Sequence, residues 1–178
     1  MKKIPILLLP FLFSNLITLG QTTPKTEKGW STFSDKNYSV QYPDTWILDR
    51  NPQMGMSFVV LSKLSDPKDQ FKENVNLLIQ DLKGKNMTLK SYTELSEEQI
   101  ATMVTNGKLI ESKTRNENGS EFQKLIYTGD QGMYKLKFEQ YYWIKNEKAY
   151  VLTLTCEASQ FEKFKATGEK IMNSFKFK

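Results

Sequence analysis

Four apolar stretches in the second half of the chain, joined by short turn sequences, limit the possible folds more than any other feature. They are residues 108–114, 121–128, 133–145 and 148–156. Asn118-Gly119 is a strong tight-turn signal between the first two stretches. Residues 130–132 and 146–147 supply the other two turns. Because connections this short join strands that run in opposite directions, the sequence predicts an antiparallel meander of four strands.

Strand patterns also occur before and after this meander. Tyr38, Val40 and Tyr42 alternate with polar residues, which is typical of a half-buried strand. Further predicted strands are the apolar runs 46–49, 56–62 and 74–82 and a short closing strand around 175–177. Trp30 is interpreted only as a plug at the entrance to the domain.

Two segments have a helical period instead. Apolar residues recur at helical spacing over residues 88–106, although a capping-box pattern at 96–99 leaves open a start or restart there. A second helix is predicted from Ser159, where residues 159–162 form another capping box, and Gly168 allows close approach to what lies beneath. Strands and helices segregated in this way predict an α+β fold, an antiparallel sheet covered by helices.

The N-terminus has the order of residues that a signal peptidase reads. Lys2 and Lys3 precede the apolar run 4–19, and Gly20 and a polar stretch follow. The run is shorter than the about 20 residues of a membrane-spanning helix, and it contains no cysteine for lipid attachment. We therefore expect a signal peptide at 1–20, a flexible leader at 21–29 and one domain at 30–178. The mature protein is expected to be secreted or periplasmic, neither a lipoprotein nor membrane-spanning.

The residue types missing from the chain exclude several kinds of chemistry. There is no histidine and only one cysteine, Cys156, so Ser-His-Asp and Cys-His sites, imidazole-based zinc sites and an intrachain disulfide are all impossible. Cys156 is interpreted as a partly buried residue at a strand end, since no histidine can activate it. No glycine-rich phosphate loop is present, and no cofactor or metal is predicted. Catalysis by lysine or carboxylate groups remains open.

The positive charge does not indicate a nucleic-acid binder. The chain has a net charge of +5, but its lysines are interspersed with acidic residues. A nucleic-acid-binding protein usually gathers its basic residues on one face, often with arginine. The charges are therefore interpreted as a solvated surface.

The densest aromatic cluster supplies a candidate contact surface. On a strand, Tyr141 and Trp143 share a face with Lys135, Lys137 and Lys145. The predicted contact surface consists of Lys135, Lys137, Tyr141 and Trp143. Such a mixed aromatic and basic surface suits a glycan, a lipid head group or a protein partner. The alternative is that a helix covers this face, with the lysine stems lying along its edges.

Four segments together resemble the PsbP-like family, which includes many secreted bacterial proteins. They are residues 38–46 (YSVQYPDTW), 74–77 (NVNL), 148–156 (KAYVLTLTC) and 171–175 (IMNSF). The resemblance implies an α/β/α sandwich with a central antiparallel sheet, a fold shared with a Ran-binding nuclear-import factor. It also implies binding or assembly rather than enzyme activity, and it provides no set of functional residues to transfer.

These observations predict a non-enzymatic, exported binding or accessory domain. Its partner would be an envelope protein, a glycan or a small apolar ligand. In an alternative, the domain carries a small apolar ligand in a cavity between sheet and helix, bordered by residues such as Tyr92, Met103 and Phe164. A further alternative is an enzyme that uses lysine or carboxylate chemistry.

Overall fold

The computed structural model describes residues 28–52, 55–117 and 119–178. The predicted signal peptide, residues 21–27 of the predicted leader and Asn118 of the predicted turn lie outside these ranges. The predicted division into signal peptide, leader and domain therefore stays a prediction.

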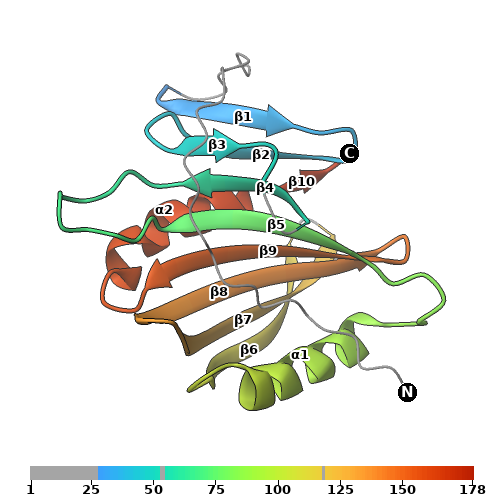
Figure 1. Ribbon diagram of the computed structural model, residues 1–178. Helices are drawn as coiled ribbons and strands as arrows, with labels where there is room; N and C mark the ends of the chain where they lie inside the picture. Colours follow the sequence, from blue (N-terminus) through green and yellow to red (C-terminus); the bar gives the residue numbers. More distant parts are fainter. Residues whose placement is uncertain (1–27, 53–54, 118) are drawn as a thin grey trace.

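The described residues form ten strands and two helices (Figure 1). In chain order these are β1 (Trp30–Ser34), β2 (Tyr38–Pro43), β3 (Ile47–Asp49), β4 (Met56–Leu61), β5 (Asn74–Asp81), α1 (Leu89–Met103), β6 (Lys108–Glu117), β7 (Ser120–Gln131), β8 (Tyr134–Lys145), β9 (Lys148–Glu157), α2 (Phe161–Asn173) and β10 (Lys176–Phe177).

The strands form one large and one small antiparallel sheet. The large sheet has the order β3-β4-β5-β9-β8-β7-β6, so the predicted meander is confirmed as its last four strands in sequence. The small sheet has the order β1-β2-β10. The predicted closing strand is confirmed as β10, which pairs with β2. Strand β1 was not predicted, because Trp30 was interpreted only as a plug.

The two helices cover opposite faces of the large sheet (Figure 1). Alternate residues of β8 separate the two cores, since side chains on a strand point to opposite faces in turn. Tyr142 packs in one cluster with Tyr92 and Ile100 of α1. Trp143 packs in the other with Phe161 and Ile171 of α2. The fold is thus an α/β/α sandwich, as predicted.

The helix starts depend on local and on tertiary interactions. Helix α1 is capped by Thr88, whose hydroxyl accepts a hydrogen bond from the Ser91 backbone N–H at 3.1 Å. The alternative start near Ser96 is wrong, since that hydroxyl donates to the Tyr92 carbonyl inside the helix. The capping box predicted at Ser159 is also wrong, because Gln160 precedes α2 without a side-chain cap. Instead of a side-chain cap, burial of Phe161 at the first position of α2 stabilises the start of the helix.

Gly168 brings α2 close to the sheet, as the sequence suggests. A Cβ atom at this position would lie 2.5 Å from Cδ2 of Leu154, a fully buried residue of β9. The backbone of the helix can therefore pack directly on this leucine only because position 168 has no side chain.

Gly168→Ala is expected to lower the free energy of unfolding by about 1–3 kcal/mol, because overpacking outweighs the better helix propensity of alanine. Urea unfolding measures this loss. The matched control is Ala166→Gly at an exposed position of the same helix, where only propensity acts and the loss is about 1 kcal/mol. A Gly168→Ala variant more stable than the wild type would contradict the close packing.

Candidate functional site

The four residues of the predicted contact surface all lie on β8, on the face toward α2. Lys135 is exposed and Lys137 is partly buried. Tyr141 and Trp143, by contrast, are only 5% and 7% exposed. The four side chains therefore do not form one open surface.

The two aromatic residues are buried because later parts of the chain cover them. The ring of Trp143 stacks on Phe175 at 5.2 Å between centroids and lies 5.8 Å from Phe177. At the edge of α2, the Lys137 Nζ lies 4.0 Å from the centre of the Phe161 ring. This is the alternative arrangement, in which a helix covers the face and a lysine stem lies along its edge. A role for the four residues in partner binding stays a prediction.

The cavity suggested for a small apolar ligand is not formed by the residues named for it. Tyr92 lies in the core beneath α1, whereas Phe164 packs in the core on the opposite face of the sheet. Met103 is 62% exposed at the end of α1. The prediction that these three residues border one cavity is wrong, because the two helices cover different faces.

A groove opens where β7 and β8 separate. The ladder between them ends at the pair Gln123–Tyr142. β8 remains paired with β9 as far as Lys145, and β7 remains paired with β6 back to Ser120. The first residues of β7 and the last residues of β8 therefore lie opposite each other without forming ladder pairs, and the groove that they border has a volume of about 440 Å³.

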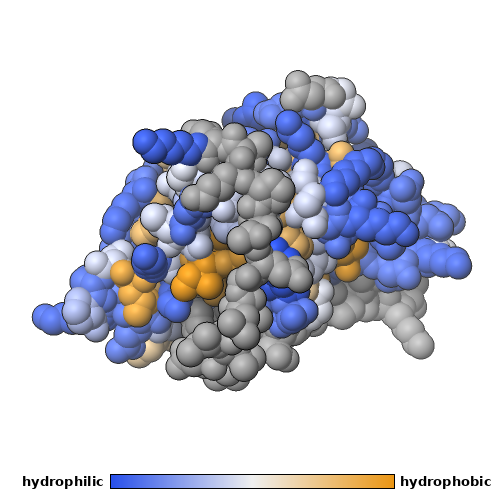
Figure 2. Space-filling model, turned by 90° about the horizontal axis from the view of Figure 1, so that it is seen from above, coloured by the Kyte–Doolittle hydropathy of each residue, from blue (hydrophilic) through white to orange (hydrophobic). Residues whose placement is uncertain are grey.

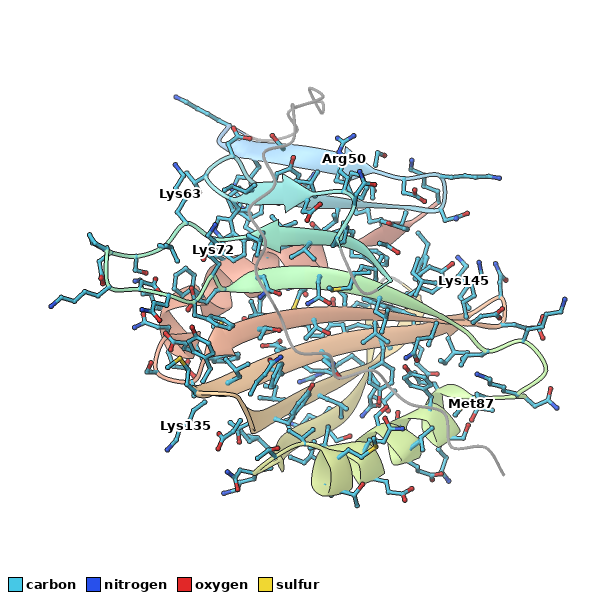
Figure 3. The ribbon with its side chains drawn as sticks, in the orientation of Figure 1. Arg50, Lys63, Lys72, Met87, Lys135 and Lys145 are labelled. Carbon is cyan, nitrogen blue, oxygen red and sulfur yellow. The ribbon has the colours of Figure 1, made fainter. Side chains whose placement is uncertain are left out.

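The groove is lined by polar and apolar residues together. Its lining residues are Thr88, Leu89, Gly119, Ser120, Glu121, Trp143, Ile144, Lys145 and Phe177. The Lys145 Nζ lies 4.5 Å from the centre of the Phe177 ring, a cation–π contact at the mouth. Lys145 and Lys135 mark opposite ends of β8 (Figure 3). Trp143 is the residue of the predicted surface that the groove contains. Lys145 was placed on the same strand face but not in the predicted surface, and Glu121 was not predicted.

A buried ion pair lies on the α2 face of the sheet, away from the groove lining. The Lys124 Nζ is 2.7 Å from Oε1 of Glu139, whose side chain is fully buried, and 3.3 Å from Oε1 of Glu169 on α2. The Lys124–Glu139 contact is therefore a close ion pair in the core.

Burial and the ion pair have opposite effects on these pKa values. Burial raises the pKa of Glu139, and Lys124 only partly reverses this. Burial tends to lower the pKa of Lys124, but Glu139 and Glu169 outweigh it and the pKa is raised. Burial, with Glu139 as the next cause, also raises the pKa of Tyr141. These are properties of a closed charged cluster in the core rather than of a site open to substrate.

Cys156 has the environment of an inert thiol. It is fully buried, and burial raises its pKa, with the carboxylates of Glu73 and Glu139 adding to the effect. A thiol held protonated in this way is a poor nucleophile. Within residues 28–52, 55–117 and 119–178, no three acidic or cysteine side chains gather as metal ligands would.

The comparison with protein families decides the affiliation. The PsbP family profile matches residues 28–177. The chain belongs to the PsbP family. This confirms the resemblance noted in the sequence, and the matched region includes both helices and all the strands described above.

Solved structures of low sequence identity share the PsbP fold. The solution structure of cyanobacterial PsbP (CyanoP) from Synechocystis sp. PCC 6803 is 19% identical, with a TM-score of 0.63 over 90% of this chain and 99% of that one. LpqN of Mycobacterium tuberculosis, described as involved in cell envelope biogenesis, is 10% identical, with a TM-score of 0.60 over 83% and 91%. A putative regulator from Pseudomonas aeruginosa is 14% identical, with a TM-score of 0.59 over 82% and 94%.

The search of curated proteins and the check for membrane-spanning helices both have negative results. A search of curated proteins finds no match to the chain. In the part of the chain that the structure describes, neither helix combines the length and the apolar character needed to span a membrane.

Proposed function

We propose that the mature chain is an exported, non-enzymatic accessory protein that binds an envelope protein in the groove between β7 and β8. The groove itself is the observation that carries this proposal, because binding sites are usually concave and combine apolar side chains with a few polar groups. The description of LpqN as involved in cell envelope biogenesis supports an envelope role, as does the signal-like N-terminus.

The location of the perturbed titratable groups supports binding rather than catalysis. Catalytic acids and bases usually combine a shifted pKa with a position in a cleft. Here Glu73 and Glu139 have raised pKa values but are buried in the core, and neither lines the groove. Lysine or carboxylate catalysis therefore has no support at the groove.

A protein partner fits the surface better than a membrane does. On the face seen from above, the described residues that are visible are mostly hydrophilic (Figure 2). A membrane-binding face would need a continuous apolar area. The lining of the groove includes instead two aromatic residues, Trp143 and Phe177, and two charged residues of opposite sign, Glu121 and Lys145.

Affinity capture from the native envelope with the mature chain tests this proposal. Lys145→Glu is expected to reduce capture of the partner several-fold, because it reverses a charge at the groove. Lys135→Glu is the matched control, since it makes the same change at an exposed lysine at the other end of β8, and capture should be unchanged. Equal capture by both variants would contradict binding in the groove.

Export is tested separately by the mass of the protein recovered outside the cytoplasm. We expect a mass that lacks residues 1–20, with the new N-terminus close to Gln21. Recovery of a product that begins at Met1 would contradict cleavage of a signal peptide.

A further inference from the structure

Among the described residues, two exposed methionines lie at one end of the large sheet. Met133 is in the turn between β7 and β8 and is 81% exposed, whereas Met103 is the last residue of α1 and is 62% exposed. Hydrogen bonds join the segment after Met103 to the end of β7. The Asp130 N–H donates to the Thr105 carbonyl at 2.7 Å, and the Asn106 amide donates to the Asp130 carboxylate at 2.6 Å. Both methionines therefore lie where β7 passes into β8.

Neither of these side chains contributes to the core of the protein. Met133 and Met103 are absent from both hydrophobic clusters, whereas Met172 of α2 is 1% exposed and belongs to the cluster beneath that helix. Methionine is a flexible apolar residue that commonly fills gaps in cores. A more polar side chain at position 103 or 133 would therefore disturb no packing in either cluster, but one at position 172 would.

The exposed thioethers are open to a known reaction of methionine. The sulfur attacks one oxygen of a hydroperoxide, the O–O bond breaks, and the sulfur keeps that oxygen as a sulfoxide. The proton of the transferred hydroxyl group goes to the leaving oxygen, which departs as water or as an alcohol. The sulfur loses two electrons and the peroxide gains them. The reaction needs access to the sulfur, which Met133 and Met103 provide and Met172 does not.

From this we propose that Met133 and Met103 are the sites at which a hydroperoxide oxidises the folded protein, while Met172 in the core is protected. Methionine sulfoxide reductases return the sulfoxide to the thioether, and the exposure of both side chains leaves the products accessible to such an enzyme. The modification is reversible and does not require unfolding. It also does not depend on the proposed groove, because Met133 directly precedes β8 and the groove residue Lys145 ends that strand.

The test treats the mature chain with dilute hydrogen peroxide and follows each methionine by mass spectrometry of its peptides. We expect Met133 and Met103 to gain one oxygen atom each, at least about tenfold faster than Met172 in the folded protein. In concentrated urea the rate at Met172 should rise to that of the other two, since the fold and not the local sequence protects it. Similar rates at Met172 and Met133 in the folded protein would overturn the proposal.

The stability of the oxidised protein provides a second test. After oxidation of Met133 and Met103 alone, the urea midpoint should equal that of the reduced protein, and a methionine sulfoxide reductase should remove both oxygen atoms. The matched control is Met103→Leu/Met133→Leu, which keeps two apolar side chains without sulfur and should show no oxygen uptake in these two peptides. A lower urea midpoint after oxidation of these two residues alone, or sulfoxides that the reductase removes only in urea, would contradict a reversible surface modification.

Discussion

Replacing Lys124 with methionine is expected to lower the free energy of unfolding by about 3–5 kcal/mol at pH 7. The variant leaves the Glu139 carboxylate fully buried with its nearest positive charge, at 2.7 Å, removed. Glu169 lies on the other side of Lys124 and offers no compensation, since it has the same charge as Glu139. An uncompensated charge in the core is among the most destabilising changes that one substitution can make.

The pH dependence of this loss follows from the raised pKa of Glu139, which burial causes. A carboxyl whose pKa is higher in the folded than in the unfolded protein stabilises the fold when both states are protonated. That contribution is lost as the pH rises through the folded pKa. Without Lys124 the folded pKa rises further, so the charged form becomes still less favourable in the core. The difference between Lys124→Met and the wild type should therefore shrink as the pH falls toward the unfolded value of about 4.3.

Urea unfolding at neutral and at mildly acidic pH measures both effects. The double variant Lys124→Met/Glu139→Gln is the control, because glutamine keeps the shape of the side chain without its charge. It should regain a large part of the lost stability at pH 7. A single-variant loss below about 1 kcal/mol that does not change with pH would be typical of a solvent-exposed ion pair and would contradict a buried one.

Trp143→Ala is expected to destabilise the protein by about 3–5 kcal/mol, as is typical of a large aromatic residue in a core. The indole ring is 7% exposed and lies near four aromatic rings. Its centroid is 5.2 Å from Phe175, 5.3 Å from Phe122, 5.8 Å from Phe177 and 6.4 Å from Tyr141. Its removal would leave a cavity that joins the groove to the core beneath α2. Thermal and urea unfolding measure the loss.

Lys135→Ala is the matched control on the same face of β8. It is exposed, so its effect on stability should stay within about 0.5 kcal/mol. Wild-type stability of Trp143→Ala would show that Trp143 is not a core residue.

A truncated Trp143 is also a poor probe of binding, because loss of capture by a partly unfolded variant says nothing about the groove. Charge reversal at Lys145 avoids this problem.

The sequence was most informative where the structure depends on neighbouring residues. The meander could be predicted because each hairpin of β6–β9 has its turn residues beside two apolar runs. The start of α2 could not be placed in the same way. The pattern at Ser159 is as good a capping box as the one at Thr88, but burial of Phe161 decides where the helix begins.

Whether the aromatic face of β8 is exposed or covered depends on residues far away in the chain. Alternation shows that Tyr141 and Trp143 share a face with three lysines, Lys135, Lys137 and Lys145. The same alternation is found whether the face is exposed or covered. The face is covered because α2 and β10, which come later in the chain, pack on it. Phe175 stacks on Trp143 there. Local patterns contain no signal for this.

The groove could not be predicted from the sequence, for a related reason. Its walls come from the start of α1, the start of β7, the end of β8 and β10. Its existence depends on where the β7–β8 ladder stops, between Tyr142 and Trp143. The family resemblance predicted the sandwich correctly, but no position of the groove could be transferred from it.

Photocross-linking in the native envelope tests most directly whether a partner occupies this groove. A photoreactive amino acid replaces either Glu121, in the groove lining, or Lys135, at the far end of β8. If the groove is the binding site, the probe at Glu121 gives one discrete adduct with an envelope protein and the probe at Lys135 gives none. An adduct from Lys135 alone, or no adduct from Glu121 in correctly folded exported protein, would contradict binding in the groove.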